Sequence, residues 1–201
     1  KLMNELLDAA GINHAVDISS DNVEDIVAFA NKTGYPQVMK VVGPVHKSDV
    51  GGVSLNVKDE AHVRAEFDRL IKIKDTYAVQ AYPMLFGTEI FIGAMRTPLF
   101  GHQVLCGLGG IFVEVLKDVQ AGLAPIGVAE AKAMIKRLRG YKIIQGVRGQ
   151  DPVNEDLYAD QIARVAALVQ AAPEIAEMDL NPLLGSPKAV VAVDARIRIE
   201  K

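Results

Sequence analysis

The amino-acid sequence predicts an α+β fold made of two α+β lobes. Helix-like and strand-like patterns alternate over residues 1–80, whereas residues 81–201 are richer in strands. Such a mixture indicates lobes in which helices cover a sheet. The segment 77–82, YAVQAY, reads as a strand where the first pattern gives way to the second. We therefore expect an N-terminal lobe over 1–80, a C-terminal lobe over 81–201 and a hinge near 77–82.

The N-terminal lobe is predicted to combine three helices with three strands. Apolar residues at helical spacing predict helices over 2–10, 23–33 and 60–71. Short apolar runs predict strands over 14–18, 38–42 and 53–57. We expect Asp21 with Glu24 to cap the second helix, Asp59 to cap the third, and Gly11 and Gly34 to end the first two.

The C-terminal lobe is predicted to place two helices beside a larger set of strands. Amphipathic patterns predict helices over 129–139, where Gly140 follows, and over 155–170. Strands are predicted over 89–95, 103–106, 178–183 and 189–197. The turn signal at 185–187 predicts that the last two strands form a hairpin.

Composition narrows the function classes. The chain has 201 residues, half of them hydrophobic, and a formal charge of −3 without a run of basic residues. A nucleic-acid surface needs clustered basic charge, so small molecules or proteins are the expected partners. No apolar run approaches the ~20 residues that span a bilayer, and the first residues do not begin a signal peptide. We expect a cytoplasmic location; a first residue other than Met fits an excised domain.

The single cysteine, Cys106, limits the chemistry further. It excludes an internal disulfide and any site that needs several cysteines. A chain with one thiol also fits a reducing compartment.

The stretch 38–53, VMKVVGPVHKSDVGGV, places a lysine inside an apolar strand. An unpaired buried charge is costly, so Lys40 is expected to meet an anionic group. The alternative is that Lys40 reaches past an edge strand into water. Gly51 and Gly52 permit a tight reversal into the next strand.

The loop within this stretch carries His46, Lys47 and Ser48. A Walker-type phosphate loop is excluded, because His46 stands where a glycine is needed before Lys47-Ser48 and a strand follows in place of a helix. His46 alone is most simply a loop histidine. The polar loop combined with Lys40 indicates a phosphate-binding segment.

A glycine-rich turn at 107–110 is a second candidate for anion binding. It does not fit a dinucleotide fingerprint, because Phe112 occupies the last glycine position and a strand is predicted to follow. Gly109 and Gly110 can still bring backbone N–H groups close to an anion. Glu114, with Lys117 and Asp118, lies beyond the turn on what is either an exposed face or an active site.

Two further charged residues stand in unusual positions. Glu89 lies within an apolar run, as a solvent-side residue or as a contact to a ribose or a metal. Arg148 follows Gly146-Val147 and precedes Gly149, which leaves its guanidinium free to meet phosphate or carboxylate.

A metal site is predicted near the C-terminus. In the strand MDLNPL at 178–183, Asp179 and Asn181 point to one face, and Met178 and Leu180 to the core. The predicted hairpin brings Asp194 near Asn181. Such oxygen groups suit Mg²⁺ held together with nucleotide phosphates. The alternative is an Asp194–Arg196 ion pair at a sheet edge.

Several motifs in order resemble one known family. They are the Lys40 strand, HKSDVGGV at 46–53, GLGGIFVEVLKDV at 107–119, GVRG at 146–149 and MDLNPL at 178–183. Together they resemble the ATP-grasp domain of the NDP-forming acyl-CoA synthetases, relatives of the succinyl-CoA synthetase β subunit. The resemblance runs from about residue 4 to about residue 197.

The resemblance implies an ATP-grasp fold whose two lobes enclose ATP or ADP with Mg²⁺. It implies that Asn181 and Asp194 hold Mg²⁺ and that Asp179 lies close to phosphoryl transfer, with His46 and Glu114 as the other catalytic candidates. The nucleotide-binding candidates are Lys40, Lys47, Ser48, Gly51, Gly52, Val79, Gln80, Ala81, Tyr82, Glu89, Gly109, Gly110 and Arg148. The family usually has an acidic residue where this chain has Ala81, so only backbone contacts to adenine are expected at 79–82. Lys40 and the pair Asn181 and Asp194 should converge on one triphosphate.

The implied activity is that of an acid–thiol ligase, an ADP-forming acyl-CoA synthetase. Phosphate would pass from ATP to a histidine on a CoA-binding, α-type partner domain, fused or separate, and then through an acyl phosphate to acyl-CoA. A hetero- or homo-oligomer is expected. We also hypothesise that His46 accepts phosphate directly. An acid-labile phosphate that forms with MgATP and the partner, and that is lost in His46→Ala, would reveal this. The alternatives are an ATP-sensing regulatory domain of a fused protein acetyltransferase, without turnover, and a structural subunit.

Overall fold

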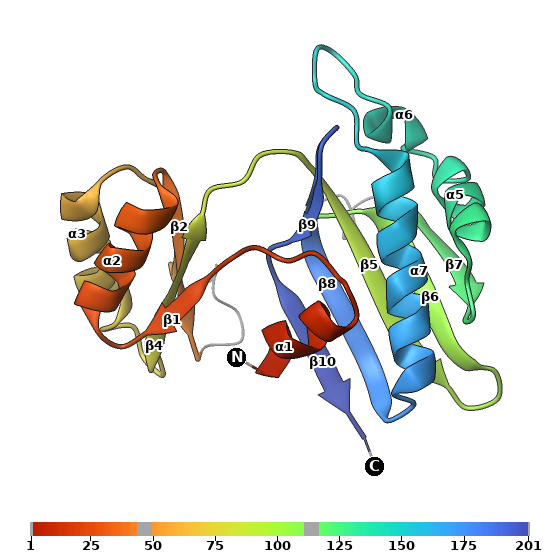
Figure 1. Cartoon of the computed structure of the whole chain (residues 1–201), viewed down its shortest axis with the longest axis horizontal. Helices are drawn as coiled ribbons and strands as arrows, with labels where there is room; N and C mark the ends of the chain where they lie inside the picture. The colour runs from red at the N-terminus through yellow and green to blue at the C-terminus, as the bar shows by residue number, and fades with distance from the viewer. Residues whose placement is uncertain (1, 44–49, 111–116, 201) are drawn as a thin grey trace. The chain divides into compact units, whose positions relative to one another are not determined.

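The computed structural model describes residues 2–43, 50–110 and 117–200, and these form two compact units (Figure 1). The smaller unit holds residues 15–85, and the larger holds residues 1–14 together with 86–201. The structural division therefore differs from the predicted lobes, 1–80 and 81–201. The difference arises because Leu7 and Ile12 are buried in the core of the larger unit. The predicted hinge, 77–82, is a strand of the smaller unit.

The described part of the smaller unit contains a four-stranded antiparallel sheet in the order β1-β4-β2-β3. These strands are β1 (Ile18–Ser20), β2 (Gln37–Val42), β3 (Val53–Val57) and β4 (Ala78–Pro83). Helices α2 (Val23–Thr33) and α3 (Glu60–Leu70) supply apolar side chains to the core of the sheet. The core consists of Ile26, Val27, Ala30, Met39, Val41, Val57, Val63, Phe67, Leu70, Val79 and Ala81.

The helix ends of the smaller unit mostly follow the sequence signals. The Asp59 side chain accepts a hydrogen bond from the His62 N–H at 2.9 Å, which confirms it as the cap of α3. Gly34 has φ +91° and ends α2 as predicted. The predicted Asp21 cap was wrong, because the side chain of Asn22 accepts the hydrogen bond from the Glu24 N–H at 3.0 Å.

The larger unit is built on a six-stranded antiparallel sheet in its described part. The order is β10-β8-β5-β6-β7, with β9 also paired to β8. The strands are β5 (Thr88–Thr97), β6 (Gly101–Leu108), β7 (Val119–Leu123), β8 (Ile175–Gly185), β9 (Val190–Ala192) and β10 (Ala195–Ile199). The helices are α1 (Leu2–Ala9), α5 (Val128–Lys136), α6 (Tyr141–Ile144) and α7 (Glu155–Ala171).

Helix α7 crosses one face of this sheet, with α5 beside it (Figure 1). Alternate residues of β5, among them Ile90 and Ile92, are buried in the core with α5 and α7. The intervening residues, such as Glu89 and Phe91, therefore belong to the opposite face. The predicted strand 14–18 was placed too early, because β1 begins at Ile18.

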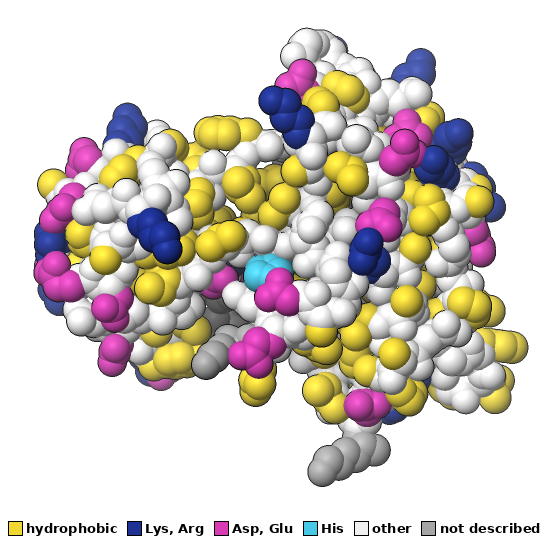
Figure 2. All heavy atoms as spheres, in the orientation of Figure 1, with side chains coloured by type: hydrophobic (Ala, Val, Ile, Leu, Met, Phe, Trp, Pro, Cys, Tyr) yellow, Lys and Arg dark blue, Asp and Glu magenta, His cyan; other side chains and the backbone are white. Residues whose placement is uncertain are grey.

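Charges of both signs lie on the face of the molecule that Figure 2 shows. Basic and acidic side chains are interspersed over the face seen in Figure 2. The face shown has no basic stripe of the kind that nucleic-acid-binding surfaces carry. In the part of the chain that the structure describes, no helix is long and apolar enough to cross a bilayer.

A buried tyrosine on α7 joins β5 to β6. The Tyr158 hydroxyl accepts a hydrogen bond from the Gly107 N–H at 3.1 Å and lies 2.8 Å from the Phe91 carbonyl and 3.0 Å from the Gly107 carbonyl, as their donor. Phe91 and Gly107 face each other across the two strands. Burial raises the pKa of Tyr158, so the hydroxyl stays neutral and can donate. The contact fixes the strand that leads into the glycine turn.

We expect Tyr158→Phe to lower the free energy of unfolding by about 1–3 kcal/mol, because it leaves buried backbone groups without the hydroxyl. Urea unfolding followed by circular dichroism measures the change. Tyr77→Phe is the matched control, since Tyr77 is 69% exposed. Equal stabilities of Tyr158→Phe and the unchanged protein would contradict the assigned role.

Candidate functional site

Strand β8 presents an amide and a carboxylate on one face of the larger sheet. Met178 and Leu180 are 1% and 0% exposed and belong to the core. Asp179 and Asn181 alternate with them and are half-buried. The predicted orientation of Asp179 and Asn181 away from the core is confirmed.

Asp194 lies beside Asn181. The Asn181 N–H donates to the Asp194 carbonyl at 3.3 Å, and the Val193 N–H donates to the Pro182 carbonyl at 3.1 Å. The predicted single strand over 189–197 is wrong in one respect. It is divided into β9 and β10, and Asp194 falls in the break. Because the backbone leaves the ladder there, Asp194 is positioned by a bend between two strands.

The glycine turn after β6 reaches the same place. The Gly109 N–H donates to the Glu89 carbonyl at 2.7 Å, and the Gly110 N–H lies 3.4 Å from Asn181 Oδ1. Gly110 has φ +58°, and a side chain on Gly109 would lie 2.7 Å from the Ile90 carbonyl. Only glycine fits this close approach. The start of β5, the turn and β8 therefore meet, as the sequence did not by itself predict.

The electrostatic environment favours a cation at this site. Burial raises the pKa of Asp179, the guanidinium of Arg196 lowers it, and the carboxylates of Asp194 and Glu177 raise it. Arg196 faces Asp179 across β8 and β10. The ionised Asp179 is therefore under-compensated, which a nearby cation would relieve.

The available ligands fit Mg²⁺. Among the described residues no cluster of three or more His, Cys, Asp or Glu side chains could hold a metal by itself. Asn181 and Asp194 offer hard oxygen atoms, and Mg²⁺ is commonly bound by one or two carboxylates together with substrate phosphates. The residues present thus suit a metal that arrives with a nucleotide.

In the smaller unit, Lys40 is buried. It is 5% exposed in the interior strand β2, and its ammonium lies 5.2 Å from the centroid of the Tyr82 ring. The alternative that Lys40 reaches past an edge strand into water is therefore wrong. A cation over an aromatic face is stabilised electrostatically, a contact that sequence analysis missed. A cross-strand pairing of Val38 with Tyr82 brings this ring within reach of Lys40.

The predicted adenine-binding residues lie in β4. Val79, Gln80 and Ala81 pair with β1, and all of β4 pairs with β2. Pairing with β1 ends at Ala81, so the backbone edge on that side opens at Tyr82. Contacts from residues 79–82 to adenine stay a prediction.

The remaining predicted residues are distributed as follows. Gly51 has φ +66° in the predicted reversal, and its carbonyl accepts a hydrogen bond from Arg69 at 2.8 Å. The Gly52 carbonyl accepts one from the Val41 N–H at 2.9 Å. Arg148 has φ +53° in the loop after α6. Four predicted site residues lie outside the described residues: His46, Lys47, Ser48 and Glu114.

Asp118 has a structural role. It is 6% exposed, and its carboxylate accepts hydrogen bonds from the Arg139 and Gly140 N–H groups at 2.9 and 2.6 Å. The alternative that Asp118 lies on an exposed face is therefore wrong, whereas the active-site alternative for this segment stays a prediction. Its hydrogen-bond donors are backbone N–H groups just before α6, a short helix that the sequence did not predict.

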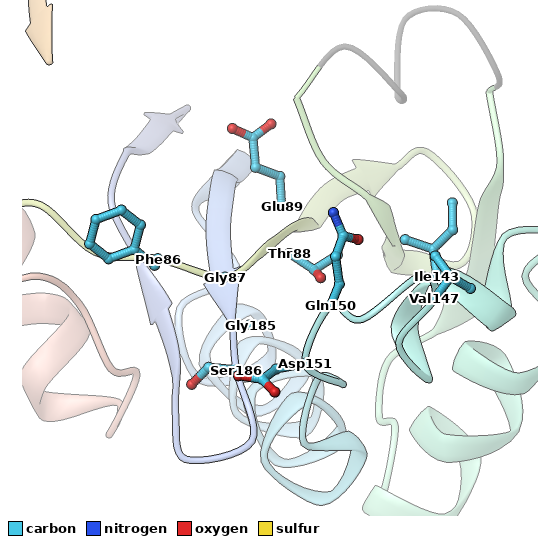
Figure 3. A pocket seen from close by; sticks show the side chains of 10 residues that line it. All are labelled: Phe86, Gly87, Thr88, Glu89, Ile143, Val147, Gln150, Asp151, Gly185 and Ser186. Carbon is cyan, nitrogen blue, oxygen red and sulfur yellow. The ribbon is translucent and has the colours of Figure 1, made fainter.

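A cavity of about 560 Å³ lies beside Glu89 within the larger unit (Figure 3). It is lined by Phe86, Gly87, Thr88, Glu89, Ile143, Val147, Gln150, Asp151, Gly185 and Ser186. The lining comes from the start of β5 and the two residues before it, from the end of β8 and the residue after it, and from α6 and the loop that follows it. Sequence analysis missed Thr88, Gln150, Asp151 and Ser186, whose only sequence signal is their position next to glycines or in a turn.

Residues 2–199 match the ATP-grasp domain family, and the chain belongs to this family. The predicted ATP-grasp fold is thereby confirmed. The predicted resemblance of the chain to ADP-forming acyl-CoA synthetases is also confirmed, because similar proteins and similar solved structures are ADP-forming acetate–CoA ligases and an acetyl-coenzyme A synthetase.

The chain is 42% identical over 186 residues to "Acetate--CoA ligase [ADP-forming] I subunit beta" of Pyrococcus furiosus, which covers 88% of this chain and 80% of that protein. It is 39% identical to "Acetate--CoA ligase [ADP-forming] I" of Archaeoglobus fulgidus over 96% of this chain and 29% of that longer protein. It also resembles the structure of Ca. Korarchaeum cryptofilum acetyl-coenzyme A synthetase 1 in complex with coenzyme A and Ca-AMPCP. That match has a TM-score of 0.91 and 36% identity, and it covers 98% of this chain and 90% of the other.

Stability should depend on pH through Asp179. A folded-state pKa above the ordinary aspartate value means that the associated stability is fully present below the unfolded-state pKa, and is lost as pH rises through the folded-state pKa. We expect Asp179→Asn to raise the free energy of unfolding at about pH 7 and to show a smaller gain at about pH 4. Urea unfolding in EDTA measures both.

Glu174→Gln is the control for this prediction, because Glu174 is an exposed carboxylate of the same unit. It should change the free energy of unfolding equally little at both pH values. A gain for Asp179→Asn that grows toward low pH would contradict the raised pKa.

The contact between Lys40 and Tyr82 can be measured by a double-mutant cycle. We expect a coupling free energy of about 0.5–2 kcal/mol between Lys40→Met and Tyr82→Leu in urea unfolding. Tyr82→Phe should retain most of the coupling, since it keeps an aromatic face. Additive effects of the two changes would show that the ring does not stabilise the ammonium.

Proposed function

We propose that this chain is the ATP-binding domain of an ADP-forming acyl-CoA synthetase of the acetate–CoA ligase type. It transfers phosphate between ATP and a histidine of a CoA-binding partner domain, which makes or uses acyl-CoA. The observation that carries the proposal is the meeting of Asn181, Asp194 and the Gly110 turn on one face of the larger sheet. Membership of the ATP-grasp family supports nucleotide as the ligand of that face.

Asn181 and Asp194 hold the metal, and Asp179 lies next to the transferred phosphate. Mg²⁺ bound there supplies charge neutralisation for the phosphate oxygens. The Gly110 N–H lies 3.4 Å from Asn181 Oδ1 and so helps to hold this amide oxygen in place, while the negative charge of Asp179 attracts the metal. Since phosphoryl transfer demands chiefly positioning and electrostatic stabilisation, these fixed groups are what the reaction needs.

Lys40 binds ATP phosphates. The loop over 45–52 is predicted to cover them, and its residues 45–49 lie outside the described part of the chain. The ammonium is already desolvated and oriented by the Tyr82 ring, so less ordering is needed when an anion binds. Residues 79–82 contact the adenine ring. That Lys40 binds the same triphosphate as Asn181 and Asp194 stays a prediction.

The partner supplies the phosphorylated histidine and the CoA site. One similar structure is described as holding Mg-AMPPCP with a "phosphohistidine segment pointing towards nucleotide binding site", at 37% identity and a TM-score of 0.86. Relatives exist both as a β subunit and as a longer single chain. The chain with MgATP and this partner completes the cycle, whereas the chain alone binds nucleotide.

The test is ADP formation from ATP, acetate and CoA by the chain mixed with the CoA-binding partner. We expect activity that Asn181→Ala and Lys40→Ala each reduce by about 100-fold or more, the size of effect reported when a transition-state charge contact is removed. Glu174→Gln is the control and should retain activity. A thermal shift with MgATP reports binding separately from turnover.

The rival functions predict different results. An ATP-sensing domain would show the MgATP thermal shift without ADP formation in the presence of the partner. A structural subunit would show neither. Unchanged activity in Asn181→Ala would remove the proposed metal site.

A further inference from the structure

We infer that Glu89 supplies a third oxygen group to the metal–nucleotide site, and that position 110 is glycine so that this carboxylate can reach it. The inference rests on the proposed function. It adds Glu89 to the proposed site and gives a reason for the glycine at position 110. It decides between the alternatives that the sequence left open for Glu89, namely a solvent-side residue, a ribose contact and a metal contact.

The first step is the approach of Glu89 to the glycine turn. A methyl group built on Gly110 would overlap the Glu89 carboxylate, with Oε2 as the nearest atom. The Glu89 backbone holds the same turn, because its carbonyl accepts the Gly109 N–H at 2.7 Å. Both the main chain and the side chain of Glu89 therefore contact Gly109-Gly110.

The second step links this carboxylate to the metal face. The N–H of Gly110 lies 3.4 Å from Asn181 Oδ1, so one residue touches both Glu89 and Asn181. Glu89 also lies on β5, next to β8 in the sheet, on the face opposite the core. Asn181 in turn is hydrogen-bonded through its backbone to Asp194. Glu89, Asn181 and Asp194 are thus joined through one turn and one backbone contact.

The third step is chemical. Mg²⁺ accepts carboxylate and amide oxygens and keeps several waters, so a third group can act directly or through a water. The Glu89 carboxylate is exposed, so a metal ion and its waters can reach it. Its position is nevertheless fixed from one side by a residue that has no side chain. A larger residue at 110 would push the carboxylate away from Asn181.

A cavity of about 560 Å³ lies beside Glu89. In Figure 3 the Glu89 carboxylate points away from the side chains of Ser186 and Asp151 at the other end of the cavity. Glu89 therefore stands at one end of the cavity, toward the turn, while the apolar Ile143 and Val147 form a side wall.

The test measures metal affinity directly. Electron paramagnetic resonance of Mn²⁺ gives its affinity for the full chain saturated with AMPPCP. We expect Glu89→Gln to weaken Mn²⁺ by about tenfold or more, as losses in a metal's supporting groups do. Calorimetry in EDTA should show AMPPCP affinity without metal to be unchanged. Glu174→Gln, which removes an exposed carboxylate of the same unit, is the charge-matched control and should leave Mn²⁺ affinity unchanged.

Gly110→Ala tests the spacer. It should weaken Mn²⁺ like Glu89→Gln, and the double variant should lose no more than either single one, since both remove the same interaction. Glu89→Asp, which shortens the side chain without touching the turn, should give an intermediate loss. This variant keeps the test informative if Gly110→Ala folds poorly.

Three results would overturn the inference. Mn²⁺ affinity unchanged in Glu89→Gln would remove Glu89 from the metal site. Loss of discrimination between ATP and 2′-deoxy-ATP, without a change in Mn²⁺ affinity, would make Glu89 a ribose contact instead. Absence of any Mn²⁺–AMPPCP binding by the unchanged chain would overturn the proposed function itself, and the inference with it.

Discussion

The site depends on the two-residue alternation of β8. Met178 and Leu180 must be buried for the larger core to close, and this burial turns Asp179 and Asn181 to the other face. A shift of one residue would exchange the two sets and place a carboxylate and an amide in the core. The same hydrophobic free energy that stabilises the sheet therefore fixes the orientation of the oxygen groups.

Around this strand, the structure uses backbone geometry more than side-chain contacts. The break at Asp194 and the glycine turn at 109–110 each bring a segment to β8 without a bulky residue between them. The Tyr158 hydroxyl anchors the strand that feeds the turn. Glycines and bends thus position these segments closely against β8, because no large side chain separates the backbones. In the smaller unit, the Tyr82 ring does comparable work for Lys40 by stabilising a desolvated ammonium.

The sequence predicted those features in which a polar residue conflicts with its apolar surroundings. Lys40, Asp179 and Asn181 stood out because burial of a charge or an amide needs a compensating partner. In the structure Lys40 is buried, and Asp179 and Asn181 are half-buried on the face opposite the core. The ATP-grasp fold came from the order of several motifs. The packing of residues 1–14 on the larger unit, and the cavity beside Glu89, depend on contacts between distant segments, which local patterns do not encode. Asp118 was misjudged because its partners are backbone groups of a helix too short to show a period.

Residues 15–85 are inserted between two segments of the larger unit, which has an effect on biosynthesis. As the nascent chain leaves the ribosome, the inserted unit has its whole core available early. Helix α1 emerges before it, yet Leu7 and Ile12 find their partners only when β5 and α7 have been made. Helix α1 therefore keeps its apolar face uncovered until α7, which ends at Ala171, has been made, and this face needs protection by the growing chain or a chaperone.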